Sequence, residues 1–247
     1  MKRDLPFDVN DTQLQAELAR KVDAATELLS DIAGRFGPAA LASSLGAEDM
    51  VLTDLIARHV PTIEIFTLDT GRLHAETYRL LQQITEHYAL RIRVVYPDGE
   101  ALERLVAEHG INGFFNSVAS RKACCAVRKV EPLRRALEGK RAWITGLRRS
   151  QSQTRTSLPL QEYDAAHGLE KFNPLVHWRE QEVWAYIRNF GVPYNALHDR
   201  GFPSIGCEPC TRAVTPGEDI RAGRWWWEEP QGKECGLHPV QWRRTAS

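Results

Sequence analysis

The sequence predicts an α/β fold with a doubly wound and mostly parallel sheet, followed by an irregular C-terminal segment and a mobile tail. Short β-rich segments alternate with amphipathic helical segments from residue 11 to about residue 146. Strands that alternate with helices are joined by right-handed crossovers and therefore run parallel. In such sheets, ligands bind in the loops that follow the carboxyl ends of the strands.

The helical segments are predicted from apolar residues that recur at intervals of three and four. In residues 11–36 these residues form one stripe, made of Leu14, Leu18, Val22, Ala25, Leu29 and Ile32. Asp11 or Thr12 is a candidate N-cap for this helix. Further helices are expected over residues 47–59, 73–88, 100–110 and 119–138.

The strands are predicted from short apolar or β-rich runs that are bounded by turn residues. They cover residues 39–43, 62–69, 91–97 and 141–146. The loops after three of them, SSLGAED, LDTGRLH and TGLRRSQSQTR, are expected to line a ligand site. From about residue 195 Pro, Gly and Cys interrupt the pattern. We therefore expect an α/β domain over residues 1–205, followed by a segment over 206–247 that is not an independent domain.

The composition is that of an ordinary soluble globular protein, with 43% hydrophobic and 26% charged residues. No stretch approaches the ~20 apolar residues of a membrane span. In a signal peptide an apolar run follows the basic residues, and no such run follows the basic residues near the start of this sequence. We therefore expect a cytoplasmic protein that does not bind a membrane.

The charge is zero overall but unevenly distributed along the chain. Residues 121–155 contain eleven Lys or Arg against two Glu, an excess of +9. Such a block is either a solvated face or a folded surface that faces an anion. Because the net charge is zero and no nucleic-acid-binding motif is recognisable, we expect a small polyanionic substrate and no nucleic acid.

The loop from Ser43 to Asp49 joins a predicted strand to a predicted helix. Its small residues let the backbone approach a ligand, and the N–H groups at a helix start form an anion site. The alternative is a plain turn in which Ser44 or Glu48 only caps the helix.

The five cysteines are expected to be ligands or catalysts, because disulfides are rare in the cytoplasm. Cys124 and Cys125 are adjacent, and Cys207 and Cys210 follow as a CxxC pair. Adjacent helical side chains diverge by ~100°, which suits a single zinc ion poorly. An iron–sulfur cubane suits them better, because each thiolate binds a different iron. A zinc site, a vicinal disulfide and unrelated buried cysteines stay open as alternatives.

Seven motifs occur together along nearly the whole chain: SLGAED, LDTGRLxxET, KACCAVRK, TGLRRSQSQTR, GCEPCTRAV, RAGRWWWE and KECGLH. In this order they resemble the assimilatory adenylyl-sulfate (APS) reductases, thioredoxin-dependent enzymes related to the phosphoadenylyl-sulfate (PAPS) reductases. The four cysteines are typical of the iron–sulfur branch of this family, whereas the PAPS-specific branch typically lacks them.

The resemblance implies an α/β fold of the adenine nucleotide alpha hydrolase-like kind. It also implies a [4Fe-4S] cluster held by Cys124, Cys125, Cys207 and Cys210, with Cys235 as the nucleophile. It further implies reduction of APS to sulfite and AMP, with electrons from thioredoxin or a glutaredoxin-like reductant. A homo-oligomer is compatible with this interpretation. His238 is a candidate proton partner of the Cys235 thiol, or a packing residue of the tail.

The substrate implied by the resemblance is anionic, so cationic clamps are expected around it. The candidates are Arg148, Arg149, Arg221 and Arg224. Lys129 follows Cys125 at i+4, on the same helical face, and the resemblance gives it a role between cluster and substrate. Ser44, Gly46 and Glu48 are expected on the phosphate side, and the turn from Leu68 through Thr70 beside adenine and ribose. The triple tryptophan 225–227 is either a lid on the nucleotide or a wedge in the core.

Three rival functions remain. PAPS, or both nucleotides, could be the substrate. An ATP-dependent adenylylating or thiolating enzyme shares the fold, but its SGGxDS loop differs from SSLGAED here. A non-catalytic iron–sulfur sensor would not need Cys235.

Overall fold

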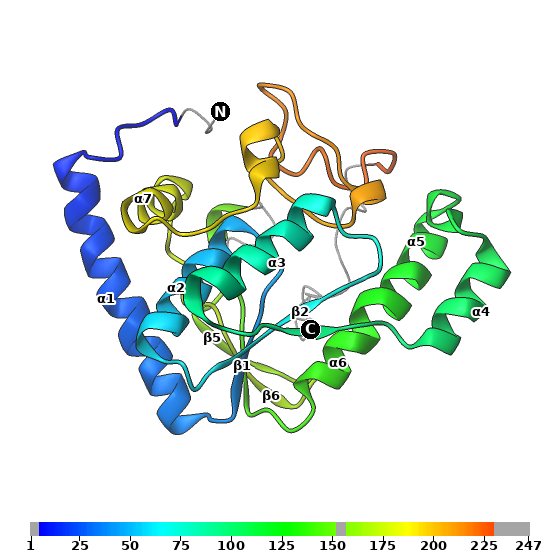
Figure 1. Cartoon of the computed structure of the whole chain (residues 1–247), viewed down its shortest axis with the longest axis horizontal. Coiled ribbons are helices and arrows are strands. Elements are labelled where there is room, and N and C mark those ends of the chain that lie inside the picture. Colours follow the sequence, from blue (N-terminus) through cyan, green and yellow to red (C-terminus); the bar gives the residue numbers. More distant parts are fainter. Residues whose placement is uncertain (1–4, 152–156, 230–247) are drawn as a thin grey trace, which may run out of the picture.

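A computed structural model of the chain describes residues 5–151 and 157–229. One six-stranded sheet runs through its centre, in the order β3-β2-β1-β4-β6-β5 (Figure 1). All neighbouring pairs are parallel except the pair of β5 and β6. This arrangement confirms the predicted α/β class with a mostly parallel sheet.

The elements follow the predicted alternation over the first two thirds of the chain. In chain order the helices and strands are α1 (Thr12–Arg35), β1 (Ala39–Ala42), α2 (Ala47–His59), β2 (Glu64–Leu68), α3 (Ala75–Tyr88), β3 (Arg93–Val95), α4 (Gly99–His109), α5 (Val118–Cys125), α6 (Glu131–Leu137), β4 (Ala142–Ile144), β5 (Gln161–Asp164), β6 (Leu169–Phe172) and α7 (Glu180–Phe190). Short 3₁₀ helices include η1 (Gly113–Phe115), η3 (Arg149–Gln151), η5 (Ala196–Arg200) and η6 (Glu208–Cys210). No described helix is both long and apolar enough to cross a membrane.

Two apolar layers cover the two faces of the sheet, because side chains alternate along each strand. Leu41 and Ile144 belong to the larger layer, which α1, α2, α3 and α7 complete. Ala40 and Trp143, their neighbours in β1 and β4, belong to the smaller layer beneath α6. The central strands are therefore buried on both faces, as expected of a parallel sheet.

The helix predicted over residues 119–138 is interrupted. Between α5 and α6, the segment Ala126–Val130 (η2) forms a π-helical turn. Pro132 follows directly and cannot donate a backbone hydrogen bond, and its ring would collide with the carbonyl of Arg128 in an unbroken α-helix. A π-turn widens the helix here and carries Lys129 between the two cysteines of α5 and the core helix α6.

A buried carboxylate fastens α2 to α3 and α7. Asp54 is fully buried and accepts hydrogen bonds from the hydroxyls of Tyr88 (2.7 Å) and Tyr186 (2.6 Å) and from Arg58 Nε (2.8 Å). Burial and the hydrogen bonds to Asp54 raise the pKa of both tyrosines above the usual range, so both hydroxyls stay protonated donors. One side chain thus satisfies donors from three helices.

We expect Asp54→Ala to lower the free energy of unfolding by about 3 kcal/mol or more, because two buried hydroxyls lose their acceptor. Urea denaturation followed by circular dichroism measures the change. Asp31→Ala is the matched control, since its ion pair with Arg35 on α1 is exposed and contributes less than about 0.5 kcal/mol. Equal stability of the two variants would contradict this account of the helix layer.

Candidate active site

A cavity of about 270 Å³ opens at the carboxyl ends of β1, β2 and β4. The loops after these strands line it, together with η2 and the segment from residue 203 to residue 225. This is the position that the strand order predicts for a ligand site in a parallel sheet. Nine of the ten predicted substrate-binding residues line the cavity: Ser44, Gly46, Glu48, Leu68, Thr70, Lys129, Arg148, Arg221 and Arg224.

Arg149 is the tenth, and the structure does not bring it to the cavity. Its guanidinium is exposed, and Nε donates to the carbonyl oxygen of Leu158 at 2.8 Å. Neighbouring residues on a short 3₁₀ turn point in different directions, so only Arg148 of this pair faces inward. Cys235 and His238 lie outside the described residues.

The first loop is held by Asp49, which the sequence analysis did not single out. Asp49 Oδ2 accepts hydrogen bonds from the backbone N–H and the hydroxyl of Ser44, both at 2.6 Å. A Cβ atom added to Gly146 would lie 2.2 Å from Asp49 Oδ1, so only glycine lets the loop after β4 approach this carboxylate. Leu45, between them, adopts a left-handed backbone with φ of 61°. Asp49 therefore fixes the loops after β1 and β4 to each other.

Burial raises the pKa of the Asp49 carboxyl to about 6; hydrogen bonds from Ser44 oppose this shift, and the charge of Glu48 adds to it. The only sequence signal for this role was its place in the SLGAED loop, beside Glu48.

Glu48, after β1, and Arg148, after β4, both line the cavity and form an ion pair. Glu48 Oε1 accepts from Arg148 Nη2 at 2.7 Å and from Nε at 2.9 Å. Burial acts to raise the pKa of Glu48, but the Arg148 guanidinium outweighs it and holds the pKa below its usual range. The two side chains are thus a charged pair, and the guanidinium that the sequence predicts as a free oxyanion clamp already has an anionic partner.

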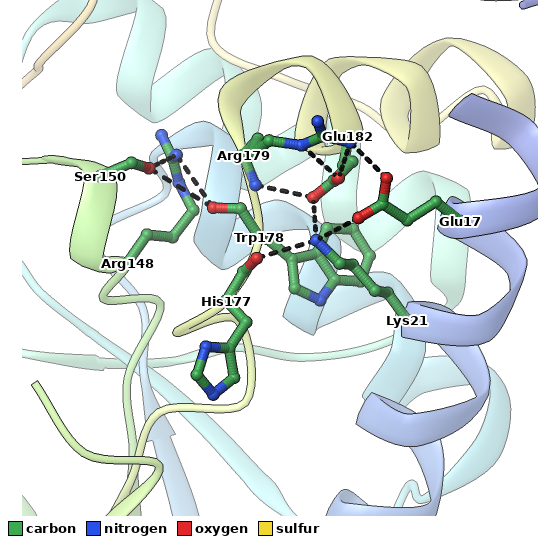
Figure 2. Close-up of polar contacts among 8 residues, drawn as sticks. All are labelled: Glu17, Lys21, Arg148, Ser150, His177, Trp178, Arg179 and Glu182. Carbon is green, nitrogen blue, oxygen red and sulfur yellow. Dashed lines mark hydrogen bonds and ion pairs between the residues drawn. The ribbon is translucent and has the colours of Figure 1, made fainter. Parts of the chain in front are cut away.

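Arg148 is held in position by backbone that directly precedes α7. Arg148 Nη1 and Ser150 Oγ both reach the carbonyl oxygen of Trp178, each at 3.4 Å (Figure 2). The next residue is Arg179, whose backbone N–H donates a hydrogen bond to Oε2 of the buried Glu182 at 2.7 Å. Lys21 of α1 donates to the same oxygen at 2.7 Å. Helices α1 and α7 therefore hold the backbone on which Arg148 rests.

The loop after β2 connects the cavity at the strand ends to the CxxC segment. Thr70 Oγ1 lies 3.3 Å from Cys207 Sγ, and the carbonyl oxygen of Thr70 accepts from Arg128 Nη1 at 2.6 Å. The Glu208 N–H donates to the carbonyl of Arg72 at 2.8 Å. Residues far apart in sequence are fixed side by side here, so the turn after β2 serves both parts of the site.

The four predicted ligand cysteines meet at a second, smaller cavity. Cys124, Cys125, Cys207 and Cys210 all line it, and no disulfide joins any two of them. Burial raises the pKa of Cys124 and brings that of Cys210 to about 12, with the neighbouring sulfur of Cys207 adding to both shifts. Within residues 5–151 and 157–229, no three His, Cys, Asp or Glu side chains are arranged to hold a single metal ion.

The two cavities share one wall. Lys129, Arg224 and Trp225 line both of them. Trp225 is 1% exposed, whereas Trp226 is half exposed, so the triple tryptophan divides between a buried wedge and the surface. Two cations therefore lie between four sulfur atoms on one side and the cavity at the strand ends on the other.

Comparison with known proteins identifies the family. Residues 38–213 match the model of the phosphoadenosine phosphosulfate reductase domain. The chain belongs to this family. That result confirms the resemblance that the seven motifs predicted.

Two curated relatives match over almost their whole length. The chain is 58% identical to the adenosine 5'-phosphosulfate reductase of Allochromatium vinosum, covering 87% of this chain and 84% of that protein. It is 55% identical to the protein of the same name from Burkholderia cepacia, covering 92% and 91%.

Solved structures agree on the fold. A phosphoadenylyl-sulfate reductase from Candida auris, in complex with phosphate, superposes with a TM-score of 0.67 at 27% identity, over 84% of this chain and 99% of that one. FMN adenylyltransferase from Candida glabrata superposes with a TM-score of 0.58 at 13% identity, over 95% and 83%, and supports the fold alone.

The raised pKa of Asp49 predicts a pH dependence of stability. The pKa is about 6 in the folded chain against 3.8 for an unperturbed Asp, so protonation of Asp49 favours folding. This contribution is fully present below about pH 4 and is lost as the pH rises through about 6. Relative to Asp49→Asn, the unsubstituted chain should therefore lose about 2–3 kcal/mol of unfolding free energy between about pH 4 and pH 7.

Urea denaturation at a series of pH values measures this difference. Asp31→Asn is the control, because the Asp31 carboxylate is exposed on α1 and its difference from the unsubstituted chain should stay flat. If the difference in unfolding free energy between Asp49→Asn and the unsubstituted chain does not change with pH, the pKa of Asp49 is not raised by folding and the prediction is wrong.

Proposed function

We propose that the chain reduces adenosine 5'-phosphosulfate to sulfite and AMP in sulfate assimilation. The observation that carries the proposal is the shared cationic wall between the cavity at the strand ends and the four cysteines. The names of the curated relatives, at 58% and 55% identity over most of both chains, point to the same substrate.

The charges around the cavity indicate how the substrate lies. Beside the first loop, Arg148 is already paired with Glu48, and Asp49 adds a second carboxyl group. Lys129, Arg221 and Arg224 bring three cations to the side formed by η2 and the C-terminal segment. The sulfate end of the substrate therefore faces this cationic side, next to the cysteine cavity, because guanidinium groups bind oxyanions with two parallel hydrogen bonds. The loops after β1 and β2 then hold the rest of the nucleotide.

The chemistry needs a thiol outside the ligand set, and Cys235 is the remaining cysteine of the chain. Its thiolate attacks the sulfur of the sulfate group, the S–O bond to the AMP phosphate breaks, and AMP leaves. The product is a Cys235 S-sulfonate. A thiolate of a dithiol reductant then attacks Cys235 Sγ and releases sulfite, and its second thiol closes to a disulfide and restores Cys235. The dithiol supplies both electrons.

The four lining cysteines fit a [4Fe-4S] cluster by the chemistry of the donor set. Four thiols around one cavity match the Cys₄ ligation of such clusters, and the adjacent pair on α5 suits ligands that bind different irons. When bound, the cluster supplies structure and electrostatics, and no redox step is required of it. Lys129, Arg128 and Arg121 line the same cavity and balance the charge of the thiolates.

The reductant is a thioredoxin or a glutaredoxin-like protein, and the compartment is the cytoplasm. The proposed reductant follows from the dithiol chemistry, since the second step needs two thiols that close to a disulfide. The proposed compartment follows from the reduced thiols that this chemistry needs, because the cytoplasm keeps thiols reduced.

We expect Cys235→Ser to abolish sulfite release from APS with a reduced dithiol protein, while the visible absorbance and the iron content stay unchanged. Only the nucleophile is lost, because Cys235 is not in the ligand set. The matched control is Cys124→Ser, which should lose the cluster absorbance as well. A non-catalytic iron–sulfur sensor predicts the opposite result for Cys235→Ser, with function retained.

The same assay separates the nucleotides. Sulfite release from APS should exceed that from PAPS at equal concentration, and faster turnover of PAPS would overturn the substrate assignment. ATP-dependent adenylylation predicts pyrophosphate release from ATP, which we expect to be absent.

A further inference from the structure

The C-terminal segment is fixed to α5 by a buried ion pair. Arg121 Nε and Nη2 each donate to one carboxylate oxygen of Glu228, both at 2.8 Å. The two side chains are 1% and 3% exposed. This is a fork-to-fork pair, which fixes direction as well as distance, because both guanidinium N–H groups and both oxygens are used.

The same guanidinium reaches the cysteine cavity. Arg121 lines this cavity together with Cys125, which lies one helical turn further along α5. Its plane lies over the ring of Trp225, 4.7 Å from the centroid, and Arg224 lies 4.8 Å from the same ring. One indole is therefore held between the arginine that faces the cysteines and an arginine that lines the substrate cavity.

The backbone of this segment is held at a strained position. Trp225 has φ of 42°, which a bulky residue adopts only where its surroundings enforce it. The Trp225 N–H donates to the carbonyl of Cys210 at 3.1 Å, and the Glu228 N–H closes a turn onto the carbonyl of Trp225 at 2.9 Å. Trp227 packs against Phe115 of η1, with ring centroids 4.4 Å apart. The CxxC segment, α5 and η1 thus all hold residues 225–228.

A buried ion pair is weak as a source of stability, because apolar side chains of similar size often replace it without loss. Its geometry, however, sets where the chain leaves the protein. Cys235 is the seventh residue after Glu228, a reach of at most about 25 Å. With a tether of this length, the point and the direction at which the chain leaves Glu228 set the effective concentration of the thiol at the sulfate side of the cavity.

We propose that Glu228 is a positioning residue for the Cys235 thiol: paired with Arg121, it links the cysteine ligand set to the chain segment that delivers the nucleophile. The inference rests on the proposed function in that Cys235 attacks the bound substrate. In this proposal the iron–sulfur site has a structural role without electron transfer. A fixed Cys125 also fixes Arg121 on the same helix, and Arg121 in turn fixes Glu228.

The test is a single turnover with the full-length chain and its native iron content. Mixed with APS in the absence of any dithiol, the chain should release AMP in a burst as the thiol is sulfonated. In Glu228→Gln the burst rate should fall on the order of tenfold, the scale of a misplaced reacting group. The affinity for AMP and the iron content should stay unchanged. A burst at the unsubstituted rate would overturn the proposal.

A double variant separates positioning from simple destabilisation. Arg121→Met with Glu228→Met removes both partners, so neither charge of the pair is left buried alone, and Lys129 and Arg128 still face the cysteines; the variant should therefore fold. Its burst should stay slow, because the directional link is gone, and recovery of the unsubstituted rate would overturn the proposal. Glu218→Gln is the matched control: it breaks a more exposed pair with Arg212 in the same segment and should leave the burst unchanged.

A second measurement distinguishes this inference from the proposed function. AMP should slow the alkylation of Cys235 by iodoacetamide several-fold in the unsubstituted chain, and this protection should be lost in Glu228→Gln. If no AMP burst occurs but the protection depends on Glu228, the proposed reaction fails and the positioning role stands. If the burst occurs and neither readout depends on Glu228, the reaction stands and the positioning role fails.

Discussion

The wall formed by Lys129, Arg224 and Trp225 is the feature on which the site depends. It separates four cysteine thiols from a cavity at the carboxyl ends of the strands, and it presents cations to both. Anions on either side lower the cost of keeping these cations buried, so the cysteine site and the substrate site are electrostatically coupled without sharing a ligand. The π-turn between α5 and α6 carries Lys129 into this wall, and the strained backbone at Trp225 completes it.

Much of the fold could be predicted from the sequence, because the first four strands and their helices follow clear periods. The hairpin of β5 and β6 and the helix α7 were not predicted. Strands such as Gln161–Asp164 alternate between exposed and half-buried side chains, so their sequence carries little apolar signal. Helix α7 interleaves buried Glu182 with apolar residues, and the hydrogen bonds from Lys21 of α1 and from Arg179 explain a carboxylate there. Tertiary contacts, absent from a local pattern, decide both cases.

The site could be predicted where the residue type itself indicates the chemistry. It was harder to predict where neighbouring residues determine the direction and the partner of a side chain. The four cysteines meet as their spacing suggested. Arg148 and Arg149 look equivalent in the sequence, yet one is buried against Glu48 and the other is exposed. Asp49 and Glu228 escaped attention because a carboxylate beside an anion site looks unfavourable until its partners, Ser44 and Arg121, are seen.

The central claim is that the Cys235 thiol attacks the sulfate group of a substrate bound on the strand side of this wall. Peptide mass spectrometry of the chain mixed with APS, without reductant, tests it most directly. The account predicts one added SO₃ group, located on the peptide that contains Cys235 and removed by a reduced dithiol protein. An SO₃ group on any of the four cavity cysteines, or AMP release with no adduct on the protein, would contradict it.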